Sequence, residues 1–254
     1  MILGILQARM SSTRLPGKVL LPILERPMLA RQIERLRRSK TLDRLLIATT
    51  VDTSDDEIVS LARDQDVEIC RGPVDDVLDR YVSAARAHRP SHVVRLTADC
   101  PLADWQLVDR MLAFAIEGGF EYASNTIRPT WPDGLDVEVM TLQALEAAAL
   151  EARSPVEREH VTPYLIARPD RFRQGSLEDS VDLSAMRWTV DEPRDLEFVR
   201  SVYEALYPAN PAFTSADVLG LLRDRPELMA VNHGIERNEG LRRSIEKLKE
   251  SSGE

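Results

Sequence analysis

The sequence is poor in the residues that cross-link small proteins and in the apolar runs that span membranes. Its 254 residues include two cysteines, Cys70 and Cys100, which form neither a disulfide framework nor a CxxC metal knuckle. No apolar run approaches the roughly 20 residues that cross a bilayer. The first apolar run is too short for a signal peptide, because Arg9 interrupts it. We therefore expect a cytoplasmic protein with no membrane partner.

Basic charge is also scarce. The net charge of −9 argues against nucleic acid as the main partner. The shortage is uneven, however, because residues 1–40 hold nine Lys and Arg against two acids. A basic N-terminal segment in an acidic chain indicates a local anion site. For the arginines between 31 and 38, the alternative is a solvated helix face.

Short apolar runs alternate with amphipathic segments over the first 119 residues. This alternation predicts a three-layer α/β/α fold with a mostly parallel mixed sheet. The predicted strands are residues 2–8, 44–51, 67–70 and 93–98. The predicted helices are residues 28–39, 55–65, 75–88 and 102–118.

The regular alternation ends after residue 119. The predicted strands there are residues 121–124, 135–140 and 187–190. The predicted helices are residues 142–152, 157–167 and 191–206, the last with Pro193 in its first turn. We predict that residues 1–231 form a single domain and that the polar residues 232–254 form a helical tail.

The loop after the first predicted strand is a candidate anion site. It carries Arg9, Arg14 and Lys18 among small residues whose backbone N–H groups can approach a phosphate. Ligands of open parallel sheets lie beyond the carboxyl ends of the strands, where this loop begins. It is not a Walker A motif, which needs Gly in place of Ser12 and Ser or Thr in place of Val19. The alternative is a solvated turn.

Acidic residues follow other predicted strands. Asp99 and Asp191 each come directly after one, and a hard Mg²⁺ typically takes one or two carboxylates plus phosphate oxygens. Both could instead cap helices. A second cluster holds Asp133, Asp136 and Glu138; on a strand, the last two would share one face. This cluster is either an acceptor-binding surface or an exposed acidic edge.

The segment GILQARMSSTRLPGKVLLPI resembles the N-terminal signature of sugar nucleotidyltransferases, in particular the cytidylyltransferases that activate ulosonic and nonulosonic acids. The resemblance is greatest to the spore coat polysaccharide biosynthesis protein F type. Six further blocks follow in the family's order: RGPVDDVLDRY, RLTADCPL, DGLDVEV, EREHVTPY, WTVDEPRDLEFV and HGIERNEG. Together the seven blocks cover nearly the whole chain.

The resemblance implies a nucleotide-diphospho-sugar transferase fold and transfer of CMP from CTP to a sugar acid, with release of pyrophosphate. Such an enzyme serves surface polysaccharide or glycan precursor synthesis and is often a homodimer. The implied catalytic residues are Arg14, Lys18, Asp99 and Asp191, of which Asp99 and Asp191 hold Mg²⁺. The implied nucleotide-binding residues are Gln7, Ala8, Arg9, Arg14, Lys18, Arg71, Asp76 and Thr97. The implied acceptor-binding residues are Asp136, Glu138, Arg158 and His160.

The chain departs from the family pattern at one position. Enzymes specific for the eight-carbon Kdo acid have Asp-Glu-Pro where this chain has Asp99, Cys100 and Pro101. Kdo as acceptor is therefore in doubt, and we expect Cys100 to be a packing residue. Rival interpretations are the same fold acting with GTP or on a polyol or sugar phosphate, a metal-dependent glycosyltransferase, and a non-catalytic homologue.

Overall fold

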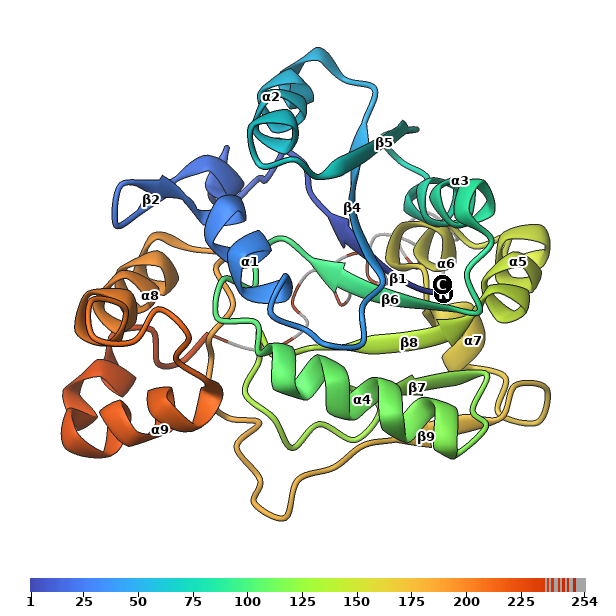
Figure 1. Cartoon of the computed structure of the whole chain (residues 1–254). Coiled ribbons are helices and arrows are strands. Elements are labelled where there is room, and N and C mark those ends of the chain that lie inside the picture. The colour runs from blue at the N-terminus through green and yellow to red at the C-terminus, as the bar shows by residue number, and fades with distance from the viewer. Residues whose placement is uncertain are drawn as a thin grey trace.

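A seven-stranded mixed sheet forms the centre of the molecule (Figure 1). The computed structural model describes residues 1–235, 237, 239, 242, 244, 246 and 249. The strands are β1 (Ile2–Gln7), β4 (Arg44–Thr50), β5 (Glu68–Gly72), β6 (His92–Thr97), β7 (Tyr122–Ser124), β8 (Glu138–Thr141) and β9 (Gln174–Ser176). Their order is β5-β4-β1-β6-β8-β7-β9. The first four are mutually parallel, whereas β8 is antiparallel to both β6 and β7.

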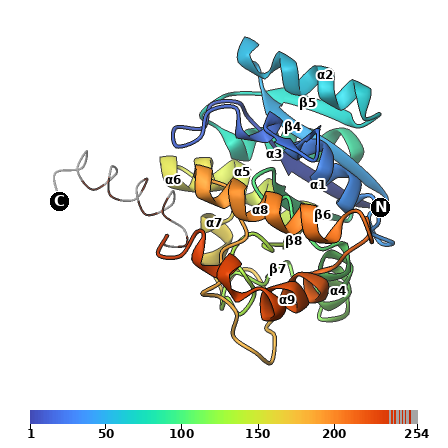
Figure 2. The same ribbon diagram turned by 90° about the vertical axis from the view of Figure 1, so that its left-hand side faces the viewer.

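Helices cover both faces of the sheet (Figures 1 and 2), which confirms the predicted three-layer fold. One face packs against α1 (Met28–Leu36), α2 (Asp56–Asp64), α4 (Trp105–Glu117), α8 (Pro193–Leu206) and α9 (Ser215–Asp224). The other packs against α3 (Val77–His88), α5 (Leu142–Glu151), α6 (Pro155–His160) and α7 (Pro163–Ile166). Side chains alternate along β1, so Leu3 and Ile5 enter one layer while Leu6 enters the other.

Strand pairing brings the predicted site segments together. Gln7, the last residue of β1, pairs with Thr97, the last residue of β6. The loops that leave these two strands therefore start side by side at the carboxyl edge of the sheet.

Several local predictions were wrong. The predicted helix 157–167 is two short helices, because Val161 between them has a φ of 71° and ends the first. Residues 187–190 do not form a strand; Arg187 makes a single parallel bridge to Asp133. The hairpin of β2 (Pro22–Ile23) and β3 (Arg26–Pro27) was not predicted, nor were β9 and α9.

The alternative interpretation that the arginines between 31 and 38 form a solvated helix face is wrong for two of them, which lie on α1. Arg31 and Arg35 are 4% and 2% exposed. The Arg31 guanidinium lies 4.2 Å from the ring centroid of Tyr207, and that of Arg35 lies 4.2 Å from the centroid of Phe213. These arginines attach α1 to the C-terminal helices by cation–π contacts and do not belong to an anion site.

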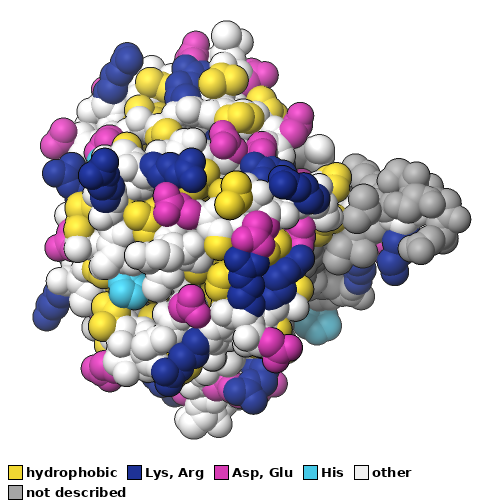
Figure 3. All heavy atoms as spheres, turned by 90° about the vertical axis from the view of Figure 1, so that its right-hand side faces the viewer, with side chains coloured by type: hydrophobic (Ala, Val, Ile, Leu, Met, Phe, Trp, Pro, Cys, Tyr) yellow, Lys and Arg dark blue, Asp and Glu magenta, His cyan; other side chains and the backbone are white. Residues whose placement is uncertain are grey.

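The outer surface is mixed in character. On the face shown in Figure 3, acidic and basic side chains are interspersed and hydrophobic side chains are scattered among them. Within the described part of the chain, no helix is long and apolar enough to cross a membrane. The cytoplasmic location, the homodimer and the domain limit at residue 231 stay predictions. Of the predicted helical tail, residues 236, 238, 240, 241, 243, 245, 247, 248 and 250–254 lie outside the described residues.

Gly134 provides a test of how the 187–190 segment is held against the sheet. Its φ is 105°, and a Cβ would meet the backbone N of Thr189 and lie 2.6 Å from the carbonyl carbon of Trp188. We expect Gly134→Ala to lower the free energy of unfolding by about 2–4 kcal/mol in urea titrations. In the control Gly220→Ala, the new Cβ on α9 lies no closer than 3.8 Å to another atom. A Gly134→Ala protein as stable as this control would contradict the packing described.

Candidate functional site

The cationic loop after β1 folds back on itself and delivers Lys18 to the sheet edge. The Met10 N–H donates to Asp55, which is 1% exposed, and this bond holds the loop against β4. Gly17, with a φ of 67°, donates its N–H to the Met10 carbonyl and closes the turn. Lys18 then begins the short helix η1 (Lys18–Leu20) with its side chain pointing inward.

Lys18 joins the two predicted aspartates. Its Nζ donates to Asp99 Oδ2 at 3.2 Å, to Asp191 Oδ1 at 2.8 Å and to the Val190 carbonyl at 2.7 Å. Burial alone would lower the pKa of Lys18, but the charges of Asp99 and Asp191 raise it, so the ammonium stays charged. Lys18, Asp99 and Asp191, all implied catalytic residues, therefore form one ion cluster in which the ammonium is buried and the two carboxylates are partly exposed.

Asp99 belongs to the cluster through its backbone as well as its side chain. Its carbonyl accepts the Val190 N–H at 2.8 Å and the Thr189 hydroxyl at 3.2 Å, which joins the segment after β6 to the one before α8. Burial would raise the pKa of the Asp99 carboxyl, but the charge of Lys18 and hydrogen bonds, including one from Thr97, lower it to about 2. Asp99 caps no helix; Asp104 caps α4.

Arg187 holds Asp191 from the opposite side. Its guanidinium donates to Asp191 Oδ2 at 3.1 Å, to Asp133 at 3.0 Å and to both oxygens of the fully buried Asp195. The cap of α8 is Glu192, so Asp191 is not a helix cap. Arg14 adds a third cation to Asp191, at 2.9 Å.

Two cavities meet at this cluster, and both are lined by Arg14, Arg95, Thr97, Asp99 and Asp191. The first cavity, of about 410 Å³, lies against the loop after β1. Its further lining includes Gln7, Ala8, Arg9 and Lys18, all predicted nucleotide-binding residues. Arg9 has no ion pair with any described residue, so its guanidinium is available to an anionic ligand.

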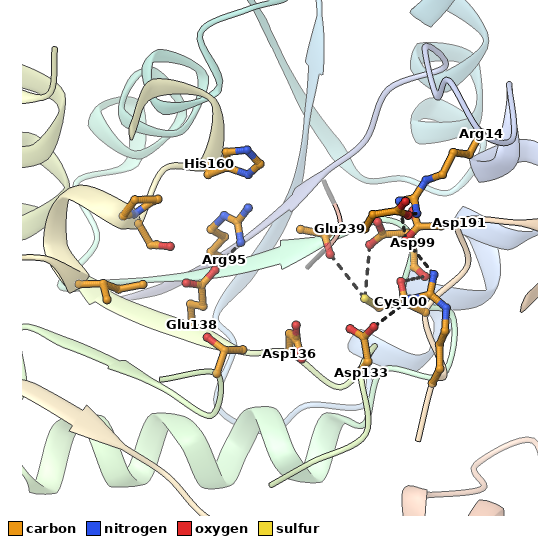
Figure 4. A pocket seen from close by; sticks show the side chains of 17 residues that line it. Arg14, Arg95, Asp99, Cys100, Asp133, Asp136, Glu138, His160, Asp191 and Glu239 are labelled. Carbon is orange, nitrogen blue, oxygen red and sulfur yellow. Dashed lines mark hydrogen bonds and ion pairs between the residues drawn. The ribbon is translucent and has the colours of Figure 1, made fainter. Parts of the chain in front are cut away.

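The second cavity, of about 360 Å³, is rich in carboxylates (Figure 4). Asp133 and Asp136 lie along it, Asp99 and Asp191 at one end, and Arg95, Glu138 and His160 at the other. Burial raises the pKa of Asp136 to about 7, although the charge of Arg237 opposes this. Burial also lowers the pKa of His160. The predicted acceptor residues Asp136, Glu138 and His160 thus share one cavity.

Three predicted site residues line neither cavity. Arg71 donates to the Thr50 and Asp52 carbonyls and pairs with Asp56. Asp76 caps α3 and pairs with Arg158, whose guanidinium also donates to carbonyls at the end of α5. These contacts anchor loops and helices, so the binding roles of the three stay predictions.

Sequence reasoning missed several residues that line or support the cavities. Arg95 on β6 pairs with Glu138, which also accepts a hydrogen bond from Tyr122. Arg187 and Arg237 pair with acids that are distant in sequence. Arg95 and Arg237 lie inside family blocks and Arg187 directly precedes one, but this position in the sequence does not reveal their partners.

A cationic loop after the first strand of a mostly parallel sheet faces aspartates from two other segments, which is the arrangement that the resemblance to sugar nucleotidyltransferases implied. The chain belongs to the cytidylyltransferase family, whose model matches residues 3–211. It is 34% identical over 233 residues to the spore coat polysaccharide biosynthesis protein SpsF of Bacillus subtilis, covering 89% of this chain and 95% of that protein. A cytidylyltransferase structure from Leptospira borgpetersenii superimposes with a TM-score of 0.87 at 32% identity, covering 93% of this chain and 99% of that one.

Two less similar proteins have names that state an activity. A 3-deoxy-manno-octulosonate cytidylyltransferase of Anaeromyxobacter sp. (strain K) is 29% identical over 240 residues, covering 79% of this chain and 97% of that protein. A CMP:2-keto-3-deoxy-manno-octonic acid synthetase, solved with CTP, shares the fold at a TM-score of 0.61 and 17% identity, covering 80% of this chain and 98% of that one.

The lowered pKa of Asp99 predicts a pH dependence of stability. A carboxyl whose folded pKa of about 2 lies below its ordinary value of 3.8 stabilises the fold above the ordinary value. That contribution disappears as the pH falls from about 4 towards about 2. Urea unfolding of wild type and Asp99→Asn should therefore differ at about pH 6, and the difference should shrink steadily below about pH 4. A difference independent of pH would contradict the Lys18–Asp99 ion pair.

The buried Asp195 tests the support of Asp191. We expect Asp195→Ala to cost about 3–5 kcal/mol of unfolding free energy, because it leaves the Arg187 guanidinium, 7% exposed, without its closest counter-charge. The matched control Asp217→Ala removes an exposed helix-capping carboxylate of α9 and should cost about 1 kcal/mol. Equal losses in the two variants would show that the Arg187 network contributes no more than a surface cap.

Proposed function

We propose that this protein transfers CMP from CTP to a sugar acid of the ulosonic or nonulosonic type and releases pyrophosphate. One observation carries the proposal: Lys18 joins Asp99 and Asp191 at the border between two cavities. Two substrates bound in adjoining cavities would react where the cavities meet. The names of the relatives support CTP and a sugar acid as these substrates.

The cavity beside the loop after β1 suits a nucleoside triphosphate. Arg9, Arg14 and Lys18 line it, and forked guanidiniums and an ammonium neutralise phosphate oxygens. The polypeptide at Gln7 and Ala8 would face the base. These cations would also stabilise the charge that develops on the pyrophosphate leaving group.

The donor set at the border fits Mg²⁺. The carboxylates of Asp99 and Asp191 both contact the Lys18 ammonium, at 3.2 and 2.8 Å, so both face the same point at the border. No group of three or more His, Cys, Asp or Glu in the described part of the chain is arranged to hold a metal. Two carboxylates are the usual protein share for Mg²⁺, whose other ligands are phosphate oxygens and water. When bound, the metal would neutralise phosphate charge and acidify an acceptor hydroxyl.

The acceptor would occupy the carboxylate-rich cavity. Asp136 and Glu138 would accept hydrogen bonds from its hydroxyls, while His160 and Arg95 would face it from the far end. A hydroxyl directed at the border with the first cavity would then lie in line for attack on the α-phosphorus.

A nucleotide-by-acceptor matrix tests the substrates. Each of CTP, GTP, ATP and UTP is combined with Kdo, N-acetylneuraminate or a polyol phosphate, with and without Mg²⁺, and pyrophosphate is measured. We expect release with CTP and a sugar acid when Mg²⁺ is present. Release that needs GTP or a polyol phosphate would replace the proposed substrates, and transfer from a finished nucleotide-sugar without pyrophosphate would indicate a glycosyltransferase.

Asp99→Asn tests the assignment at the cavity border. We expect turnover to fall by at least about 10²-fold, since the variant loses a charge that would hold Mg²⁺ against the phosphates. The exposed Asp170→Asn serves as control and should keep full activity. An Asp99→Asn enzyme with wild-type turnover would remove Asp99 from the metal site.

A further inference from the structure

The far end of the carboxylate-rich cavity, where Arg95, Glu138 and His160 lie, includes the segment that joins α6 to α7 (Figure 4). His160 is the last residue of α6 and Ile166 the last residue of α7, and both line this cavity. The positive φ of Val161 ends the first helix directly after His160, so the chain turns before it forms the second. A local break in the chain thus shapes the far end.

The charged groups at the far end cancel. Arg95 pairs with Glu138, the residue opposite it on β8. Burial lowers the pKa of His160, so its ring is uncharged at neutral pH. Glu159, 3.7 Å from that ring, lines the other cavity. Among the described residues, this end therefore offers no excess positive charge to a carboxylate or a phosphate of the acceptor.

Ile166 gives the far end an apolar surface. Its side chain is 39% exposed, and of the exposed large hydrophobic side chains in the described part of the chain it alone lines one of the two cavities. Gln174 fixes its position by donating to the Leu165 carbonyl at 2.7 Å and to the Ile166 carbonyl at 3.2 Å. Pro163, three residues earlier on α7, lines the same wall. Apolar groups in a cavity wall typically contact the apolar part of a ligand.

Two hydroxyl groups also line the far end. Thr126 lies there because its hydroxyl is 2.7 Å from that of Ser124, which pairs with Glu138 across β7 and β8. Thr162, between the two short helices, lines the same cavity. A hydroxyl can both donate and accept a hydrogen bond, so this end can bind neutral polar atoms beside its apolar surface.

An acylamino group matches this combination. It carries no charge, it has one N–H donor and one carbonyl acceptor, and its methyl group is apolar. A hydroxyl in its place would cover Ile166 with a polar group. In a ulosonic acid the carboxylate is attached to the carbon that bears the reacting hydroxyl. The carboxylate would therefore lie at the cavity border, and the opposite side of the sugar would occupy the far end.

We propose that the far end of the carboxylate-rich cavity binds an acylamino group of the acceptor, with Ile166 against its methyl group. The proposal rests on the proposed transfer of CMP to a sugar acid, and it names the class of that acid: one with an acylamino substituent. The far end disfavours acids that carry only hydroxyls, such as Kdo, and acceptors that would place a phosphate there.

Two acceptors that differ in one group test the proposal. N-acetylneuraminate has an acetamido group at C5, and its counterpart with a hydroxyl at C5 is otherwise identical. With CTP and Mg²⁺, we expect kcat/KM for pyrophosphate release to be at least about tenfold higher with the acetamido acid, because only this acid fills the apolar surface. Equal values, or a preference for the hydroxyl acid, would overturn the proposal.

Ile166→Ser tests whether Ile166 makes the contact. The preference for the acetamido acid should fall to about threefold or less, since serine removes the apolar surface. Leu150→Ser is the matched control and should keep the wild-type preference, because Leu150 is an exposed residue of α5 that lines neither cavity. An Ile166→Ser enzyme with the wild-type preference, whatever its total activity, would overturn the assignment of Ile166. Thermal unfolding of both variants shows that the fold is retained.

The same assay separates failure of this proposal from failure of the proposed function. Pyrophosphate release that is greatest with Kdo or with the hydroxyl acid would keep CMP transfer to a sugar acid but overturn the acylamino site. Release with a polyol phosphate and with none of the sugar acids would overturn both.

Discussion

The site depends on one buried ammonium and the two carboxylates that neutralise it. Lys18 is 81 residues from Asp99 and 173 residues from Asp191 along the chain. A buried ammonium is stable only when counter-charges and hydrogen bonds replace its water. The loop after β1, the segment after β6 and the segment before α8 must therefore meet for any of them to be stable. The same requirement fixes the border at which the two cavities join.

The surrounding ion pairs contribute more to the conformational specificity of this arrangement than to the stability of the fold. Arg187 and Asp195 are nearly or fully buried, and desolvating both charges offsets most of their attraction. Removing one partner is much more costly than the pair is stabilising, since the other charge remains buried. Displacement of residues 187–191 would likewise leave charged side chains buried without their partners, at a similar cost in free energy. The network therefore allows few alternative positions for Asp191.

The sequence was sufficient for the features that follow from local pattern and sheet geometry. Apolar runs predicted the four parallel strands, and the ends of β1 and β6 had to be neighbours once those strands were adjacent. In the sequence, Lys18 and Asp99 each follow a predicted strand, and the family resemblance implied that they share a site; the pairing of β1 with β6 that brings them together was found in the structure. The sequence pattern could not identify which charges pair with which, because pairing is decided by side chains from distant elements. Asp76 and Arg158, 82 residues apart, are bound to each other outside the cavities.

Short segments were harder to predict for a related reason. Residues 187–190 have a strand-like composition, but the neighbour they meet is a turn at Gly134, which allows one bridge and no ladder. The break at Val161 likewise separates two helices that share an apolar pattern. In both places tertiary contacts override local propensity.

The pairing of nearly every cation at the cavity border affects how any anion can bind there. Lys18, Arg14 and Arg187 each already contact a carboxylate, whereas Arg9 pairs with no described residue. A triphosphate would therefore form a new ion pair with Arg9. At Arg14 and Lys18 it would only replace carboxylates that are already bound, so the binding free energy gained at these two residues would be a difference between two similar interactions. Mg²⁺ would change this balance, because it would satisfy Asp99 and Asp191 as the ammonium and guanidinium turn to phosphate. Mg²⁺ bound to the two aspartates would free the cations for phosphate, and phosphate bound to the cations would free the aspartates for Mg²⁺. Metal and nucleotide would therefore bind cooperatively.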